Sequence, residues 1–76
     1  MVQAYVMIDI AAGTVEDVLS EIQSIEAVTE AHVVAGDFDV IAEVQGEVVR
    51  DILITVTREI RPLDGVGTTK SYICLD

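Results

Sequence analysis

The chain has 76 residues and a formal net charge of −10, from 14 Asp and Glu against four Lys and Arg. At this length the chain can only just bury a single hydrophobic core, so we expect one domain over residues 1–76. The negative charge repels phosphate backbones and anionic lipids, which argues against direct contact with nucleic acid or with a membrane. Apolar residues make up 51% of the chain, and we expect a second chain to cover part of them.

The excess of acidic residues has two possible explanations. A source with high internal salt would tolerate dense surface charge, and an ordinary acidic domain would explain the charge equally well.

The single cysteine, Cys74, cannot form an intrachain disulfide, and no signal peptide precedes the first strand-like segment. Both features favour the cytoplasm, and no apolar stretch approaches the roughly 20 residues that cross a bilayer.

The first two predicted elements are a strand and a helix. Residues 3–10 alternate at the two-residue period of a strand, with apolar side chains on both sides. After a short Ala-Ala-Gly segment, Thr14 and Asp17 have the spacing of a helix N-cap box. The apolar residues that follow recur at helical spacing and predict one stripe that packs on a sheet: Val15, Val18, Leu19, Ile22 and Ile25.

A predicted hairpin follows the helix. Residues 27–36 and 38–45 are rich in β-branched side chains and roughly alternate, as strands do. Gly36 and Asp37 lie between them and suit a tight turn.

The last two predicted elements are a helix and a strand. From Glu47 to Pro62 the apolar residues return to helical spacing: Val48, Val49, Ile52, Leu53, Val56 and Ile60. The high β-branched content makes a strand the competing assignment, but the segment is long for a strand in so small a domain. Residues 66–75 alternate again and predict the final strand.

The order strand, helix, strand, strand, helix, strand predicts an α+β domain of the ferredoxin-like βαββαβ type. In this arrangement two helices cover one face of a four-stranded antiparallel sheet. The other face is open, yet the strands carry apolar groups on both sides and therefore need a second cover. We expect the sheet of a partner subunit to supply it, which predicts a homodimer.

Few residues suit metal or catalytic chemistry. His32 and Cys74 lie on separate predicted strands without a carboxylate pair at ligand spacing, so we expect no metal site and no cofactor. We expect Cys74 to be a small buried apolar residue and His32 to be a sheet-edge or interface residue with a satisfied hydrogen bond. The sequence contains no nucleophile elbow, no phosphate-binding Gly-rich loop and no Ser/His/Asp spacing, so we do not expect an enzyme.

Two segments favour the binding of a zwitterion. The turn GDFD, residues 36–39, brings two carboxylates and backbone amides to one sheet edge, and residues 65–71 supply hydroxyls at the start of another strand. Carboxylates accept hydrogen bonds from an ammonium group, whereas amides and hydroxyls donate to a carboxylate, so an amino acid is a sensible ligand. A purely structural role is the alternative, since such turns and hydroxyl pairs are common in sheets. The candidate ligand-binding residues are Gly36, Asp37, Asp39, Thr69 and Ser71.

The same segments carry a family resemblance. The run VVAGDFDVIAEV, the helical segment after it and the run PLDGVGTTKSYICL resemble the C-terminal effector-binding domain, or RAM domain, of the Lrp/AsnC family of feast/famine transcription regulators, over nearly the whole chain. The most specific matches are a Gly-x-aromatic-Asp motif and a late Gly-Val followed by alternating hydroxyls: Gly36, Phe38, Asp39, Gly65, Val66, Thr69 and Ser71. The resemblance implies a βαββαβ unit that dimerises through its sheets, with dimers assembled into rings, commonly of four dimers, and amino-acid effectors bound between dimers.

The resemblance also implies roles for single residues. It assigns ligand contact to Gly36 and Asp39 from the hairpin, and to Thr69 and Ser71 from the last strand of the same or a neighbouring dimer. Ser71 stands where the family usually has Thr, which keeps the hydroxyl and loses a methyl group. Family regulators carry a helix-turn-helix domain ahead of this unit, whereas this chain begins at the first strand. We therefore expect a stand-alone effector-sensing and oligomerisation module, with full-length Lrp/AsnC regulators as candidate partners.

Two other functions remain open on the sequence alone. A small dimeric α+β-barrel enzyme of the monooxygenase type shares this topology, and a cleft inside each protomer lined by Tyr5 and His32 would support it. An ACT-like regulatory subunit, which binds amino acids beside an enzyme chain, is the other. The position of the ligand separates an effector domain from the enzyme, because the former binds between dimers and the latter inside the protomer.

Overall fold

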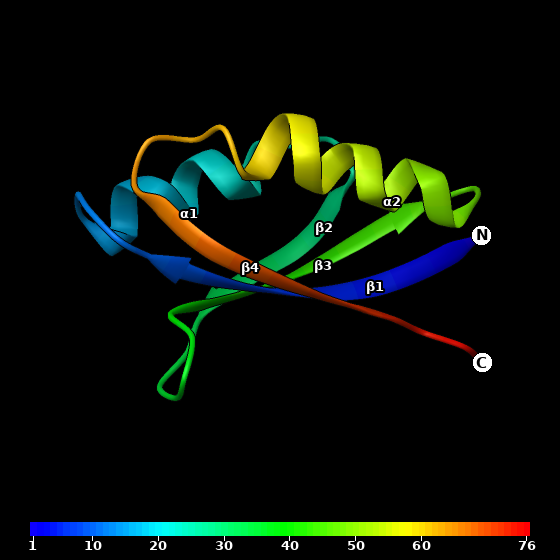
Figure 1. Cartoon of the computed structure of the whole chain (residues 1–76), viewed down its shortest axis with the longest axis horizontal. Helices are drawn as coiled ribbons and strands as arrows, with labels where there is room; N and C mark the ends of the chain where they lie inside the picture. Colours follow the sequence, from blue (N-terminus) through cyan, green and yellow to red (C-terminus); the bar gives the residue numbers. More distant parts are fainter.

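A computed structural model describes all residues of the chain, 1–76. Two helices lie on one face of a four-stranded antiparallel sheet (Figure 1). The strands, in the spatial order β2-β3-β1-β4, are β1 (Val2–Ile10), β2 (Val28–Val33), β3 (Val40–Gly46) and β4 (Val66–Ile73). The helices are α1 (Val15–Gln23) and α2 (Val49–Thr55), and α2 continues directly into one π-helical segment, η1 (Val56–Ile60). The predicted ferredoxin-like α+β fold is confirmed, as is a helix rather than a strand for the fifth element.

The alternation of β1 decides which face of the sheet becomes the core. Ala4, Val6 and Ile8 are fully buried beneath the helices, whereas Tyr5 and Met7 lie on the opposite face. β3 continues the buried rows with Val40, Ala42 and Val44. Burial of each larger aliphatic side chain stabilises the fold by about 1.5–3 kcal/mol, so these rows fix the face on which the helices pack.

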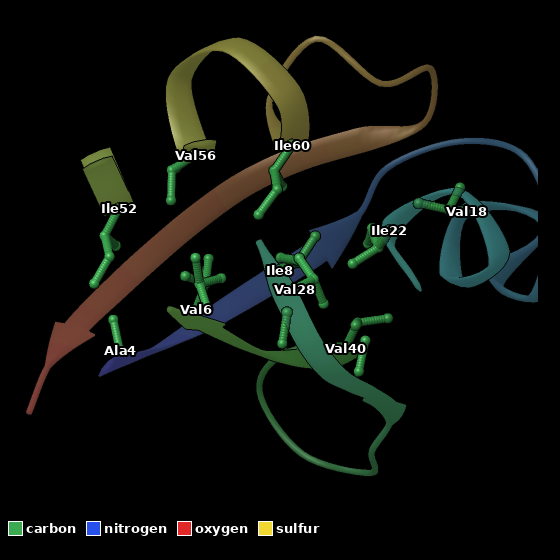
Figure 2. Packing of buried hydrophobic residues seen from close by; sticks show 13 residues of the cluster. Ala4, Val6, Ile8, Val18, Ile22, Val28, Val40, Ile52, Val56 and Ile60 are labelled. Atoms are coloured by element: carbon green, nitrogen blue, oxygen red, sulfur yellow. The ribbon is translucent and has the colours of Figure 1, made fainter. Parts of the chain in front are cut away.

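Both helices contribute an apolar row to this core (Figure 2). From α1 the buried residues are Val18 and Ile22, and from α2 and η1 they are Ile52, Val56 and Ile60. The predicted α1 stripe is confirmed, because its three other members, Val15, Leu19 and Ile25, are half-buried against the same core. The predicted α2 stripe is only partly buried, because Val48, Val49 and Leu53 are exposed.

Each helix begins at a polar capping interaction. The Thr14 hydroxyl accepts a hydrogen bond from the backbone N–H of Asp17 at 3.3 Å, which confirms the predicted N-cap of α1. At the start of α2 the Asp51 carboxylate accepts hydrogen bonds from the backbone N–H groups of Glu47, at 3.0 Å, and Val48, at 3.2 Å. These contacts help a β-branched segment to form a helix. Neither helix is long and apolar enough to cross a membrane.

The π turn of η1 is a feature that the sequence pattern did not predict. The backbone N–H of Arg61 donates to the carbonyl of Val56 at 2.9 Å, five residues earlier. A π turn contains more residues than an α-helical turn. Val56 and Ile60 are four residues apart and lie on the same side of the segment, and both side chains reach the core.

The predicted tight turn at Gly36 and Asp37 is wrong. β2 ends at Val33 and β3 begins at Val40, so the connection is the six-residue segment 34–39. The physical reason is Asp39, whose backbone N–H donates to Ile8 and whose side chain continues the bonding to β1, as described below. The loop projects from the sheet on the side away from the helices (Figure 1).

A close crossing of two connections explains one glycine. Gly65 has φ of +92°, and a Cβ added there would lie 2.3 Å from the carbonyl oxygen of Ala12. The Gly65 carbonyl accepts hydrogen bonds from the N–H groups of Ala11, at 2.7 Å, and Ala12, at 3.3 Å. Only glycine adopts this backbone conformation without strain and leaves room for the contact. The start of β4 is thereby attached to the end of β1.

Candidate functional site

The hairpin part of the predicted site lies at an exposed loop. Gly36 and Asp37 are both exposed in the segment 34–39. A Cβ added to Gly36 would meet no atom within 4 Å, and its φ is not positive. Nothing inside the folded protomer therefore requires glycine at this position, in contrast to Gly65.

Asp39 is held more firmly than its loop neighbours. Its Oδ2 atom accepts a hydrogen bond from the backbone N–H of Ile10 at 2.8 Å, and its own N–H donates to the carbonyl of Ile8 at 3.0 Å. The carbonyl of Asp39 accepts from Val34 at 2.9 Å. The half-buried side chain therefore extends the ladder between β1 and β3 by one hydrogen bond, while its Oδ1 atom accepts no hydrogen bond within the protomer.

The strand part of the predicted site lies on β4. Thr69 pairs with Ile8, and Ser71 pairs with Val6. Directly paired residues share a face of the sheet, so both hydroxyls lie on the side that carries the helices. Thr69 is half-buried and Ser71 is exposed.

The protomer brings Asp39 and Thr69 to the same end of the sheet without enclosing a site. Asp39, directly before β3, donates its N–H to Ile8, and Thr69 on β4 pairs with Ile8 from the other side. Two strand spacings of about 4.8 Å put their backbones roughly 10 Å apart. The exposed part of the loop projects away from the helices, whereas the β4 hydroxyls lie on the helix side. The hollows on the protomer surface are lined by none of the five predicted residues.

The open face of the sheet is a mixed surface. At its centre are four apolar or aromatic side chains of three adjacent strands: Tyr5, Met7, Ile41 and Tyr72. The two tyrosines form a direct cross-strand pair between β1 and β4. Polar interactions surround this centre, and the Gln3 amide donates to the Glu43 carboxylate. The predicted apolar character therefore holds at the centre of the face but not at its margins.

His32 and Cys74 differ in how well the structure matches their predicted roles. His32 lies on the edge strand β2, and its Nε2 atom is 3.2 Å from Oε1 of Glu30, which confirms an edge histidine with a hydrogen bond. Cys74 follows β4 and is half-buried, so the predicted buried strand cysteine is wrong. No hollow is lined by both Tyr5 and His32, because β3 separates their strands.

Comparison with known proteins identifies the family. Residues 3–76 match the family model described as the Lrp/AsnC ligand binding domain. A search of the curated proteins found no match. Among solved structures, the crystal structure of FFRP-DM1 is 29% identical with a TM-score of 0.90, and the alignment covers 99% of this chain and 100% of that one. A protein of Thermus thermophilus is 28% identical with a TM-score of 0.94, covering 100% and 95% of the two chains.

Longer regulators contain the same unit. The feast or famine regulatory protein of M. tuberculosis, solved in complex with L-methionine, is 26% identical with a TM-score of 0.85. Its alignment covers 100% of this chain and 51% of that regulator, so the chain spans about half of its length. The E. coli AsnC structure, at 20% identity and a TM-score of 0.90, shows the shared fold. With the family model matched over residues 3–76, this chain belongs to the Lrp/AsnC ligand-binding domain family.

Proposed function

We propose that residues 1–76 form one non-catalytic sensor domain that binds an amino acid, or a metabolite with the same ammonium and carboxylate groups, between dimers. Membership of a ligand-binding family supports the regulatory role. The M. tuberculosis relative complexed with L-methionine supports an amino acid as the class of ligand. Full-length Lrp/AsnC regulators are the proposed protein partners, in the cytoplasm.

The observation that carries this proposal is the division of the predicted site between the two sides of the sheet. The loop 34–39 projects on one side and the hydroxyls of Thr69 and Ser71 lie on the other, and no hollow of the protomer includes any of them. A site built from both parts needs a loop from one chain and a strand from another. The occupancy of such a site would therefore depend on the assembly of the chains as well as on the concentration of the ligand.

Each proposed contact has a chemical reason. The free Oδ1 atom of Asp39 accepts a hydrogen bond from the ligand ammonium, which is a charge-assisted interaction. The loop amides around Gly36 and Asp37 donate to the ligand carboxylate. The open space beside Gly36 admits the ligand to the backbone, since no protein atom lies where a Cβ would be. A hydroxyl from β4 completes the carboxylate contacts.

The open sheet face is the proposed dimer interface. Its central Tyr5, Met7, Ile41 and Tyr72 would be covered by the same face of a second copy, at the roughly 10 Å spacing of stacked sheets. Aromatic residues and Met are enriched in the cores of protein interfaces. Further association of these dimers into a ring would bring the two parts of the ligand site together.

Isothermal titration calorimetry with the twenty amino acids tests the function directly. We expect at least one to bind with a stoichiometry of no more than one ligand per chain. Asp39→Asn is expected to weaken binding, while Glu26→Gln, which removes an exposed carboxylate elsewhere, leaves binding unchanged. If no amino acid binds to the assembled protein, the proposed ligand class is wrong.

A further inference from the structure

The cations of this acidic chain are concentrated on one helix. Of its four Lys and Arg residues, Arg50, Arg58 and Arg61 lie on or directly after α2 and η1. All three are exposed, and none forms an ion pair, since the single ion pair of the structure joins His32 and Glu30. The same segment also carries two exposed carboxylates, Asp51 and Glu59, so residues 49–61 have a net charge of 3 − 2 = +1. In a molecule with a net charge of −10, this is still the helix that better attracts a negatively charged partner.

The same helix exposes apolar side chains between its arginines. Arg50, Ile54 and Arg58 follow one another at intervals of four residues and so form one row. Val49 and Leu53 form the adjacent row, with 43% and 50% of their surface exposed. Arginine is enriched in protein interfaces, and the apolar side chains beside it would gain stability from being covered.

The exposed surface of α1 has the opposite character. Glu16, Asp17 and Glu21 are all exposed, and α1 contains no basic residue. Both helices lie in one layer on the same face of the sheet (Figure 1), yet no carboxylate of α1 pairs with an arginine of α2 in the same chain. Within one protomer, two complementary surfaces are therefore both left without partners.

We propose that the exposed face of α2 and η1 binds the exposed face of α1 from a second copy of this chain. Arg50 and Arg58 would pair with the α1 carboxylates, while Val49, Leu53 and Ile54 lose contact with water. The contact joins two different surfaces, so each chain has one of each to offer, and such head-to-tail contacts generate rings when their rotation closes. It leaves the open sheet face free, and it names the surface that links one sheet-paired dimer to the next.

Two charge-reversed variants test the contact by analytical ultracentrifugation at 0.1 M salt. The first, Arg50→Glu with Arg58→Glu, takes the net charge from −10 to −10 − 4 = −14. The second, Glu16→Arg with Glu21→Arg, takes it to −10 + 4 = −6. We expect the wild type to be larger than a dimer and each variant alone to lose that higher assembly. The second variant is the sharper test, because a simple reduction of net repulsion would strengthen association instead.

Mixing the two variants provides the matched control. Each acidic α2 then meets a basic α1, and each basic α2 meets an acidic α1, so we expect the wild-type mass to return. Circular dichroism of each variant checks that the helices are retained, and Arg50→Ala with Arg58→Ala offers a milder change. If the second variant alone keeps the wild-type mass, or the mixture does not restore it, the proposal is wrong.

The readout separates this contact from the ligand site and from the sheet dimer. Mass is measured without ligand, so loss of amino-acid binding has no effect on the result. Variants that fall to dimers support both the helix contact and the sheet interface. Variants that fall to monomers from a larger wild type support the helix contact and contradict the sheet interface. A wild type that is itself no larger than a dimer overturns the helix contact.

Discussion

The Oδ2 atom of Asp39 accepts a hydrogen bond from the backbone N–H of Ile10 at 2.8 Å. This bond joins the loop before β3 to the end of β1, 29 residues away in sequence. One oxygen of the carboxylate therefore holds the loop in place, and the other accepts no hydrogen bond within the protomer, so it is available for the proposed ligand. The structural role of Asp39 is compatible with the proposed binding role, and two different substitutions are needed to separate the two.

Asp39→Ala removes both roles. The Ile10 N–H loses its acceptor, so we expect the free energy of unfolding to fall by about 1–3 kcal/mol. Loss of the charge-assisted contact to a ligand ammonium is expected to weaken amino-acid binding by roughly 10- to 100-fold. Asp39→Asn keeps an oxygen that can accept from Ile10, so it should lower the stability less while still weakening binding. Melts followed by circular dichroism, together with calorimetric titration, measure both effects, and unchanged affinity in Asp39→Asn would remove Asp39 from the site.

Gly36 and Gly65 should respond in opposite ways to alanine. Gly65→Ala introduces strain at φ of +92° and a clash with the carbonyl oxygen of Ala12, so we expect a loss of more than about 1 kcal/mol. Gly36→Ala meets no atom within 4 Å and should leave stability unchanged or raise it by up to about 1 kcal/mol. If the ligand approaches the backbone at Gly36, the same substitution lowers its affinity. Urea unfolding and titration of both variants test this contrast, which a stability loss in Gly36→Ala would contradict.

Much of the fold is visible in local patterns. The alternation of β1, the Thr14 cap and the Val18–Ile22 row are short-range features, and each corresponds to an element of the structure. The loop 34–39 differs from the tight turn that local residue preferences predict, and its last residue is bound to the distant Ile10 N–H. Local turn preferences contain no information about such a partner.

The candidate site is less accessible to prediction than the fold. The chemistry of the side chains in the sequence indicated carboxylates and hydroxyls as candidate ligand contacts. The structure places the loop and the β4 hydroxyls on opposite sides of the sheet. In the proposed site they converge only through a second chain, and a single sequence does not specify the position of that chain. The exposed row of Arg50, Ile54 and Arg58 was also missed, because the spacing of the apolar residues alone suggested one buried stripe. The four-residue spacing of Arg50, Ile54 and Arg58 is the feature of the sequence that indicates this row.

A charge at Met7 tests the sheet interface. Met7 is half-buried at the centre of the open face, and Met7→Glu would place an unpaired carboxylate inside a sheet-to-sheet dimer. We expect loss of the dimer, because burial of an unpaired charge costs several kcal/mol. Ser20→Glu adds the same charge at an exposed position of α1, on the helix side of the sheet, and should keep the dimer. Light scattering measures both masses, and a dimeric Met7→Glu would show that another surface pairs the chains.

Salt should stabilise this protein. A net charge of −10 on 76 residues produces repulsion in the compact state, and raising ionic strength from about 0.1 M to about 1 M shortens the Debye length from roughly 10 Å to 3 Å. We therefore expect the urea midpoint of unfolding to rise with potassium chloride. A midpoint that stays flat up to molar salt would mean that charge repulsion contributes little to the stability.

Thr69→Val tests the strand part of the ligand site. Valine keeps the shape of threonine and removes only the hydroxyl, and the Thr69 hydroxyl makes no hydrogen bond within the protomer, so the stability should change little. A neutral hydrogen bond contributes about 0.5–1.5 kcal/mol, so the expected loss of amino-acid affinity is roughly 2- to 10-fold, smaller than that for Asp39→Asn. Thr68→Val, at the neighbouring exposed position, is the matched control and should bind as the wild type does.

A mixture of two variants tests whether Asp39 and Thr69 act from different chains, as proposed. The mixture contains equal amounts of Asp39→Asn and Thr69→Val chains. Random assembly would then form some sites with neither substitution, and titration should detect a fraction with wild-type affinity. If no such fraction appears after subunit exchange has been shown by mass, both residues act within one chain and the shared-site model is wrong.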